Sequence, residues 1–135
     1  MKSRLEYLQD WIAKAESDFK IARREMAHED PASDAVCFHF QQCAEKMLKA
    51  YLIGMEASFR PTHNIAALLK LCEDLDPEFA TLRHAEILTP YAVEIRFADD
   101  LYFPNEEETQ EALECALAVR AMVLEKLRPS DSHVH

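Results

Sequence analysis

The segment from Val36 to Leu52 constrains the fold of this chain more than any other part of its sequence. It reads VCFHFQQCAEKMLKAYL. On a helical wheel most of its polar side chains fall within an arc of about 120°. The polar side chains of this arc are His39, Gln42, Glu45, Lys46 and Lys49. Because a surface helix has one apolar stripe and this one is apolar over most of its circumference, we predict a central, mostly buried helix with one narrow polar window.

The composition indicates one all-α domain. The chain has 135 residues, of which 49% are hydrophobic, enough for a substantial core. A single glycine leaves little scope for tight hairpins or for a phosphate-binding loop. The net charge of −10 argues against non-specific nucleic-acid binding, which depends on neutralising phosphates. The N-terminus does not resemble a signal peptide and no apolar run is long enough for a membrane span, so we predict a cytoplasmic protein.

Start and stop signals divide the chain into five predicted helices. Their expected ranges are 3–27, 31–55, 62–75, 77–101 and 105–127. Their expected N-caps are Ser3, Asp30, Thr62 and Asn105, and Asp76-Pro77-Glu78 is expected to open the fourth helix. Pro90 is expected to kink or break the fourth helix, because proline lacks the backbone donor and clashes with the preceding turn.

Short connections between amphipathic helices favour antiparallel neighbours. We therefore predict an all-α fold, an antiparallel up-and-down bundle of four long helices with one short helix crossing an end, and no strand. The domain is expected to cover residues 1–128, followed by a disordered tail at 129–135.

No catalytic or metal-binding motif is found in the sequence. Ser-His-Asp, HExxH, Walker and paired Cys/His signatures are absent. The cysteines lie inside helical patterns without CxxC spacing, so we interpret them as buried apolar side chains in a reducing cytoplasm. They are Cys37, Cys43, Cys72 and Cys115. No catalytic residue, metal site or cofactor is predicted.

The polar window of the central helix has two interpretations. Glu45 and Lys49 are spaced i, i+4 in the favourable orientation, which is typical of an ordinary solvated ion pair. Alternatively the window faces a cleft or a subunit interface and binds a ligand. His39, at the edge of the apolar stripe, is interpreted as a partly buried, hydrogen-bonded histidine rather than a catalytic one.

A second polar cluster consists of Arg96 with Asp99 and Asp100. It is interpreted either as local pairing at a helix end or as an anion-binding guanidinium directed into a cleft or dimer interface. His63, beside the expected cap Thr62, has a local capping role or helps to hold an anion at a helix start.

Three motifs in this order resemble the HEPN domain family of small helical proteins. They are QxxEKxxK from Gln42 to Lys49, the pair Thr62-His63, and an Arg-aromatic-x-Asp motif from Arg96 to Asp99. The resemblance spans about residues 5–127. It implies an antiparallel helical bundle that homodimerises, in a family whose members are paired with minimal nucleotidyltransferases in toxin–antitoxin-like systems and have been proposed to bind nucleotides. Other members of the family are metal-independent ribonucleases and toxins.

The ribonuclease members carry a histidine a few residues after the arginine, and this sequence departs from that pattern. No histidine occurs between Arg96 and His133, and the usual RYPD of the related branch is RFAD here. Without the imidazole that would transfer protons, a binding module is favoured over an enzyme. A dimeric ribonuclease or toxin and a pure dimerisation scaffold remain the alternatives.

Two expectations follow for the site and for assembly. The anionic group of a nucleotide or partner is expected to meet a site made of Arg96, Asp99, Lys49, Glu45, Gln42 and His63. A symmetric homodimer is expected through exposed aromatic residues, because such patches mark interfaces. These aromatic residues are Tyr91, Phe97, Tyr102 and Phe103.

Overall fold

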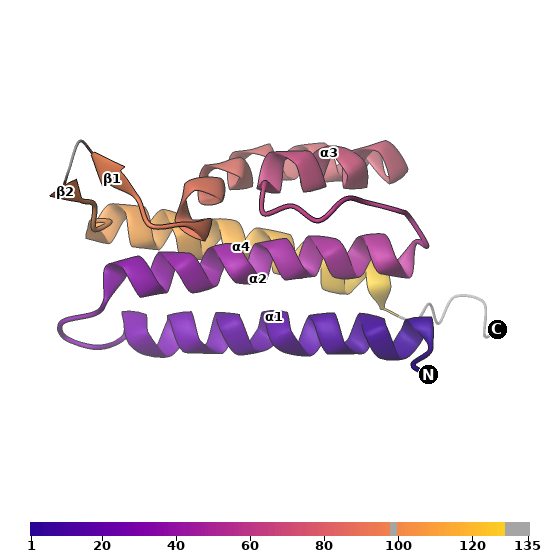
Figure 1. Ribbon diagram of the computed structural model, residues 1–135, viewed down its shortest axis with the longest axis horizontal. Helices are drawn as coiled ribbons and strands as arrows, with labels where there is room; N and C mark the ends of the chain where they lie inside the picture. The colour runs from indigo at the N-terminus through magenta and orange to yellow at the C-terminus, as the bar shows by residue number, and fades with distance from the viewer. Residues whose placement is uncertain (98–99, 129–135) are drawn as a thin grey trace.

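The chain forms an antiparallel helical bundle, as the sequence predicts. The computed structural model describes residues 1–97 and 100–128, with the backbone alone at 96 and 97. Its elements in chain order are α1 (Arg4–Met26), α2 (Ser33–Gly54), α3 (Ile65–Leu75), the 3₁₀ helix η1 (Pro77–Ala92), β1 (Arg96–Phe97), β2 (Asp100–Leu101) and α4 (Glu106–Leu127). In Figure 1, α2 runs between α1 on one side and α3 with η1 on the other, and α4 lies alongside it.

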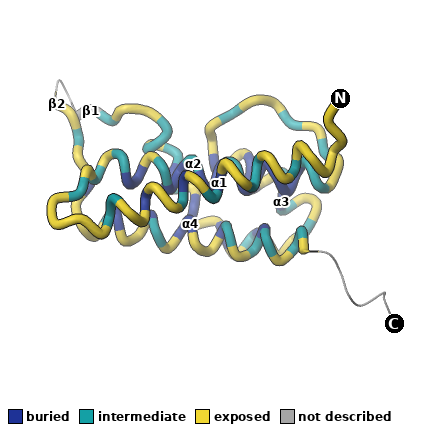
Figure 2. The backbone as a smooth tube through the Cα atoms, turned by 90° about the horizontal axis from the view of Figure 1, so that it is seen from below, coloured by how far each residue is buried: buried dark blue, intermediate teal, exposed yellow. Residues whose placement is uncertain are grey.

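The central position of α2 explains its unusual composition. It packs against α1, α3, η1 and α4, and more than half of its 22 residues are buried. The buried residues of the chain lie on the helix faces turned toward the centre of the bundle (Figure 2). Phe40, Met47 and Leu48 of α2 are completely buried, and the Phe40 ring meets Phe19 of α1 edge to face.

The four cysteines are buried free thiols, as predicted. Burial raises the pKa of Cys37, Cys43 and Cys72 to about 12 and that of Cys115 to about 11. At neutral pH these thiols are therefore protonated and poor nucleophiles.

Two of the four predicted N-caps, Ser3 and Asn105, are confirmed, and the fourth helix opens after Asp76 as predicted. Ser3 and Asn105 each form a capping box with the glutamate three residues on, and Asp76 accepts from the Glu78 amide. The two other caps were wrong because both helices begin later in the chain than predicted, α2 at Ser33 and α3 at Ile65.

The first of the wrong caps is Asp30. α2 begins after Ala32 with no capping side chain of its own, and the Ala32 amide donates to Glu25 of α1 at 2.8 Å instead. The second is Thr62. α3 is capped by Asn64, whose side chain accepts from the Ala67 amide at 3.1 Å, while the Thr62 hydroxyl accepts from the Asn64 amide.

The fourth predicted helix is a 3₁₀ helix, and it ends at Ala92 rather than near residue 101. Its buried side chains recur at every third position, at Phe79, Leu82, Ala85 and Leu88. A 3₁₀ helix has three residues per turn, so these side chains lie in one row, whereas α-helical geometry would rotate them progressively away from the core. Pro90 lies in its last turn and does not split the helix into two.

The absence of strands was also predicted incorrectly. After Ala92 the backbone becomes extended at Val93, and β1 pairs with β2 in an antiparallel register that places Arg96 opposite Leu101. β-branched Val93 and Ile95 favour the extended backbone, and the ladder continues through the Tyr102 amide bonded to the Ile95 carbonyl at 2.9 Å.

The predicted tail at 129–135 lies outside the described residues. None of the described helices is long and apolar enough to cross a membrane.

Candidate functional site

The polar window of α2 is organised around the Glu45 carboxylate. Lys49 Nζ donates to Oε2 at 2.9 Å, while Gln41 Nε2 and His63 Nδ1 lie 3.0 Å and 2.8 Å from Oε1. Gln42 Nε2 extends the network by donating to the side-chain oxygen Oε1 of Gln41 at 2.7 Å. Glu45 is buried, yet both of its oxygens are satisfied, so its charge is tolerated inside the bundle.

Burial and hydrogen bonding act on Glu45 in opposite directions. Burial alone would raise the pKa of the carboxyl group, but hydrogen bonds from Lys49, Gln41 and His63 outweigh it and hold that pKa below its ordinary value. Glu45 is therefore ionised at neutral pH and can only accept hydrogen bonds, so the proton shared with His63 is on Nδ1.

The Glu45–Lys49 pair is not a solvated surface pair. Both side chains are buried, and Lys49 Nζ lies 5.6 Å from the centroid of the Trp11 ring of α1. The ammonium group thus contacts a carboxylate and an aromatic face rather than water. The charge of Lys49 is already neutralised by Glu45 of the same helix. Its contact with Trp11 helps to hold α1 and α2 together.

Further along the same window, Asp18 of α1 binds two side chains of α2. His39 Nδ1 lies 2.8 Å from Oδ1, and Lys46 Nζ donates to Oδ2 at 2.6 Å. His39 is thus the partly buried, hydrogen-bonded histidine that its position predicts. Within the described part of the chain, no buried side-chain polar atom lacks a hydrogen-bond partner.

Sequence reasoning missed the roles of Gln41, Asp18 and Trp11. Asp18 stands between Ala15 and Ala22 on the buried face of α1, and a charge within an apolar stripe is a signal for a buried partner. Gln41 is one turn before Glu45, which is the spacing of a helical side-chain pair.

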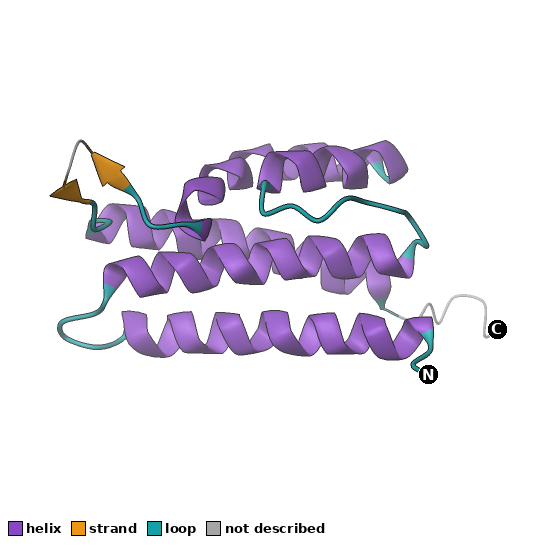
Figure 3. Ribbon diagram, viewed as in Figure 1, coloured by secondary structure: helices purple, strands orange, loops and turns teal. Residues whose placement is uncertain are grey.

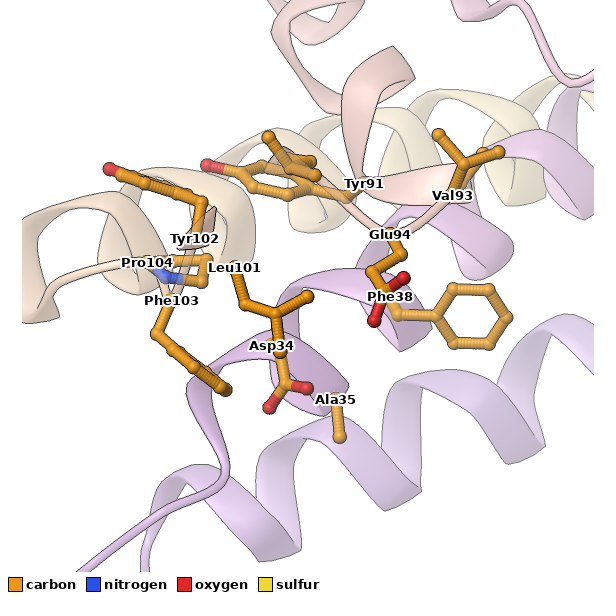
Figure 4. A pocket seen from close by; sticks show the side chains of 12 residues that line it. Asp34, Ala35, Phe38, Tyr91, Val93, Glu94, Leu101, Tyr102, Phe103 and Pro104 are labelled. Carbon is orange, nitrogen blue, oxygen red and sulfur yellow. The ribbon is translucent and has the colours of Figure 1, made fainter. Parts of the chain in front are cut away.

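A groove lies at one end of the bundle (Figure 4). The hairpin, the start of α2 and the last turn of η1 form its walls. The groove has a volume of about 420 Å³. Its walls include Phe38, Tyr91 and Phe103, and the carboxylates of Asp34 and Glu94 stand among them. Val93 is 67% exposed and Phe103 is 59% exposed, so the groove has an apolar rim open to solvent.

The structure brings four of the six predicted site residues into one network. They are Gln42, Glu45, Lys49 and His63. Arg96 belongs to β1, which lies at the end of the bundle where α2 begins (Figure 1). Glu45 is twelve residues into α2, or about 18 Å along its axis. The side chain of Arg96 is not described, and Asp99 lies outside the described residues.

Comparison with known proteins shows the family. The HEPN domain model matches residues 8–127, and the chain belongs to the HEPN domain family. The archaeal HEPN homologue ST0689 is similar at 25% identity over 95% of this chain and 100% of that one, with a TM-score of 0.75. TT1696 from Thermus thermophilus is 30% identical over 89% of this chain and 98% of that one, with a TM-score of 0.73. A comparison with curated proteins found no match.

Proposed function

We propose that this HEPN protein is a binding module rather than a nuclease, and that the groove beside the hairpin binds a nucleotide. The volume of the groove and its apolar and aromatic walls support this proposal, because small-molecule sites are concave, mostly apolar and carry a few polar groups.

The chemistry of the groove matches the parts of a nucleotide. The rings of Phe38 and Phe103 offer apolar faces for a base, and the Asp34 and Glu94 carboxylates can accept from ribose hydroxyls or a base amino group. Arg96 directly follows Ile95, which lines the groove, and its guanidinium is suited to a phosphate. Because the two carboxylates repel further negative charge, a nucleoside monophosphate is favoured over a triphosphate.

Arg96→Ala is expected to weaken binding of a nucleoside monophosphate by about tenfold or more, since a hydrogen bond to a charged group contributes about 1.5–3 kcal/mol. Titration calorimetry with adenosine, guanosine, cytidine and uridine monophosphates measures this effect. Arg83→Ala is the matched control, because Arg83 is an exposed arginine of η1 that is paired with Glu73. Equal affinities in the wild type and Arg96→Ala would contradict the proposed site.

The exposed apolar rim favours a second candidate, a protein interface. Val93, Leu101 and Phe103 are large apolar side chains exposed on one end of the bundle, and exposed apolar clusters mark interaction surfaces. We propose that they pair two copies of the chain symmetrically. A nucleotidyltransferase partner, the toxin–antitoxin-like pairing that other family members have, would bind the same rim.

We expect Phe103→Asp to convert a dimer into a monomer in sedimentation velocity runs at micromolar concentration. A buried carboxylate facing its symmetry mate would be desolvated and repelled. Leu117→Asp, at an exposed leucine of α4, should leave the dimer intact. A wild-type chain that stays monomeric at every concentration would disprove the symmetric interface.

We expect no cleavage of unstructured RNA at neutral pH. The sequence has no histidine between Arg96 and His133, so the imidazole that the ribonuclease members carry after this arginine is missing. Incubation of labelled RNA with the pure protein, alongside Arg96→Ala and a mock preparation, checks this. Cleavage by the wild type that disappears in Arg96→Ala would support the ribonuclease alternative.

A further inference from the structure

His63 combines a solvent-exposed imidazole ring with a buried hydrogen-bond partner. Its side chain is 69% exposed, whereas the Glu45 side chain that contacts its Nδ1 is only 4% exposed. The loop between α2 and α3 runs back along the bundle (Figure 3), and its contact with Glu45 places His63 beside the middle of α2. The backbone is also held there, because Gln41 Nε2 donates to the His63 carbonyl at 3.3 Å.

This arrangement determines the state of the two ring nitrogens. Since ionised Glu45 only accepts, Nδ1 carries the proton, and in the neutral ring Nε2 keeps its lone pair. Among the described residues none hydrogen-bonds to Nε2. A carboxylate that accepts from Nδ1 fixes the tautomer and the orientation of the ring, and it stabilises the positive charge that the ring gains when Nε2 forms a bond.

The other histidine–carboxylate contacts of the molecule do not share these properties. His39 also contacts a carboxylate through Nδ1, but its side chain is only 26% exposed and Asp18 is shared with Lys46. In His84 the nitrogen bound to Glu111 is Nε2, and that carboxylate is itself about half exposed. Only His63, of these three, presents an open Nε2 backed by a buried carboxylate.

We propose that His63 is a covalent modification site at which Nε2 accepts a phosphoryl group. The position suits an anionic product, because His63 immediately precedes Asn64, the N-cap of α3, and negative charge is favourable at a helix N-terminus. Arg60, an exposed residue of the same loop, adds positive charge. No group of three potential metal ligands occurs among the described residues, and a single open nitrogen suits covalent transfer better than metal binding.

The transfer needs a high-energy phosphoryl donor of the acyl phosphate or phosphoramidate class. The Nε2 lone pair forms the N–P bond while the bond from phosphorus to the leaving oxygen or nitrogen breaks, and the leaving group retains that electron pair. A carboxylate leaves as the anion, and an amine leaves after protonation by water. The proton on Nδ1 stays in its hydrogen bond to Glu45, whose negative charge offsets the positive charge that the ring gains.

The test uses potassium phosphoramidate as donor and follows the phosphate on each histidine by peptide mapping at neutral pH. His28 is the internal reference, because it is exposed and its ring contacts no carboxylate of the described residues. We expect His63 to be labelled about tenfold faster than His28, and Glu45→Gln to remove that advantage while leaving the His28 rate unchanged. Asp18→Asn, which alters the contact of His39, should not change the His63 rate.

Thermal unfolding of each variant shows whether it is folded. If Glu45→Gln does not fold, the ratio of the labelling rates of His63 and His28 in the wild type decides the test. The label must be lost in acid, as an N–P bond requires and a phosphate ester on Thr62 does not. Equal rates at His63 and His28, an acid-stable label, or an unchanged ratio in folded Glu45→Gln would each overturn the proposal. The groove and the function proposed for it are independent of this outcome.

Discussion

Glu45→Ala is expected to lower the free energy of unfolding by about 3–5 kcal/mol, because it leaves the Lys49 ammonium buried without its carboxylate. It also removes the acceptor of Gln41 and His63 at the same point. Urea denaturation followed by circular dichroism measures the change. Glu114→Ala, at an exposed glutamate of α4, is the control and should change stability by less than about 0.5 kcal/mol.

A double variant separates the charge from the packing. In Glu45→Leu/Lys49→Met both charges are replaced by apolar side chains, so most of the lost stability should return. A double variant as unstable as Glu45→Ala would show that the carboxylate is needed for another reason, such as holding the loop through His63.

The same pair makes stability depend on pH. The pKa of Glu45 is below its ordinary value of 4.5, so its contribution is fully present above about pH 4.5 and is lost as the pH falls through the lower pKa of the folded state. The double variant should therefore lose less stability than the wild type on acidification.

Leu88→Ala is expected to cost about 2–5 kcal/mol, the range for truncating a fully buried leucine. Glu86→Ala should be nearly neutral, because Glu86 is exposed although it lies between the buried residues Ala85 and Leu88 in the sequence. An α-helix that kept Phe79 and Leu82 inside would instead turn position 86 toward the core. The pair of variants, measured by urea denaturation, therefore tests the 3₁₀ geometry. A costly Glu86→Ala together with a mild Leu88→Ala would contradict it.

The parts of the fold that could be predicted are those encoded by local patterns. The stripes of α1 and α4 and the capping residues Ser3 and Asn105 are short-range signals, and they place helices correctly. η1 could not be separated from an α-helix with the same rules, although the spacing of Phe79, Leu82, Ala85 and Leu88 indicates it in retrospect. The hairpin was missed because two-residue strands have almost no sequence signal and depend on pairing across the turn.

The sequence alone determined that α2 is a buried helix and that its polar atoms lie mainly on one arc, because helical periodicity relates residues only a few positions apart. Only the tertiary structure decided what that arc meets. His63 is 18 residues from Glu45 in the chain, and Asp18 is 28 residues from Lys46. Such contacts depend on how the loop and α1 pack against α2. The packing must give each buried charge of α2 a partner inside the bundle, because an unpaired buried ion is costly. The polar arc therefore became an internal network, while the open apolar groove formed at the hairpin, whose strands no local pattern had predicted.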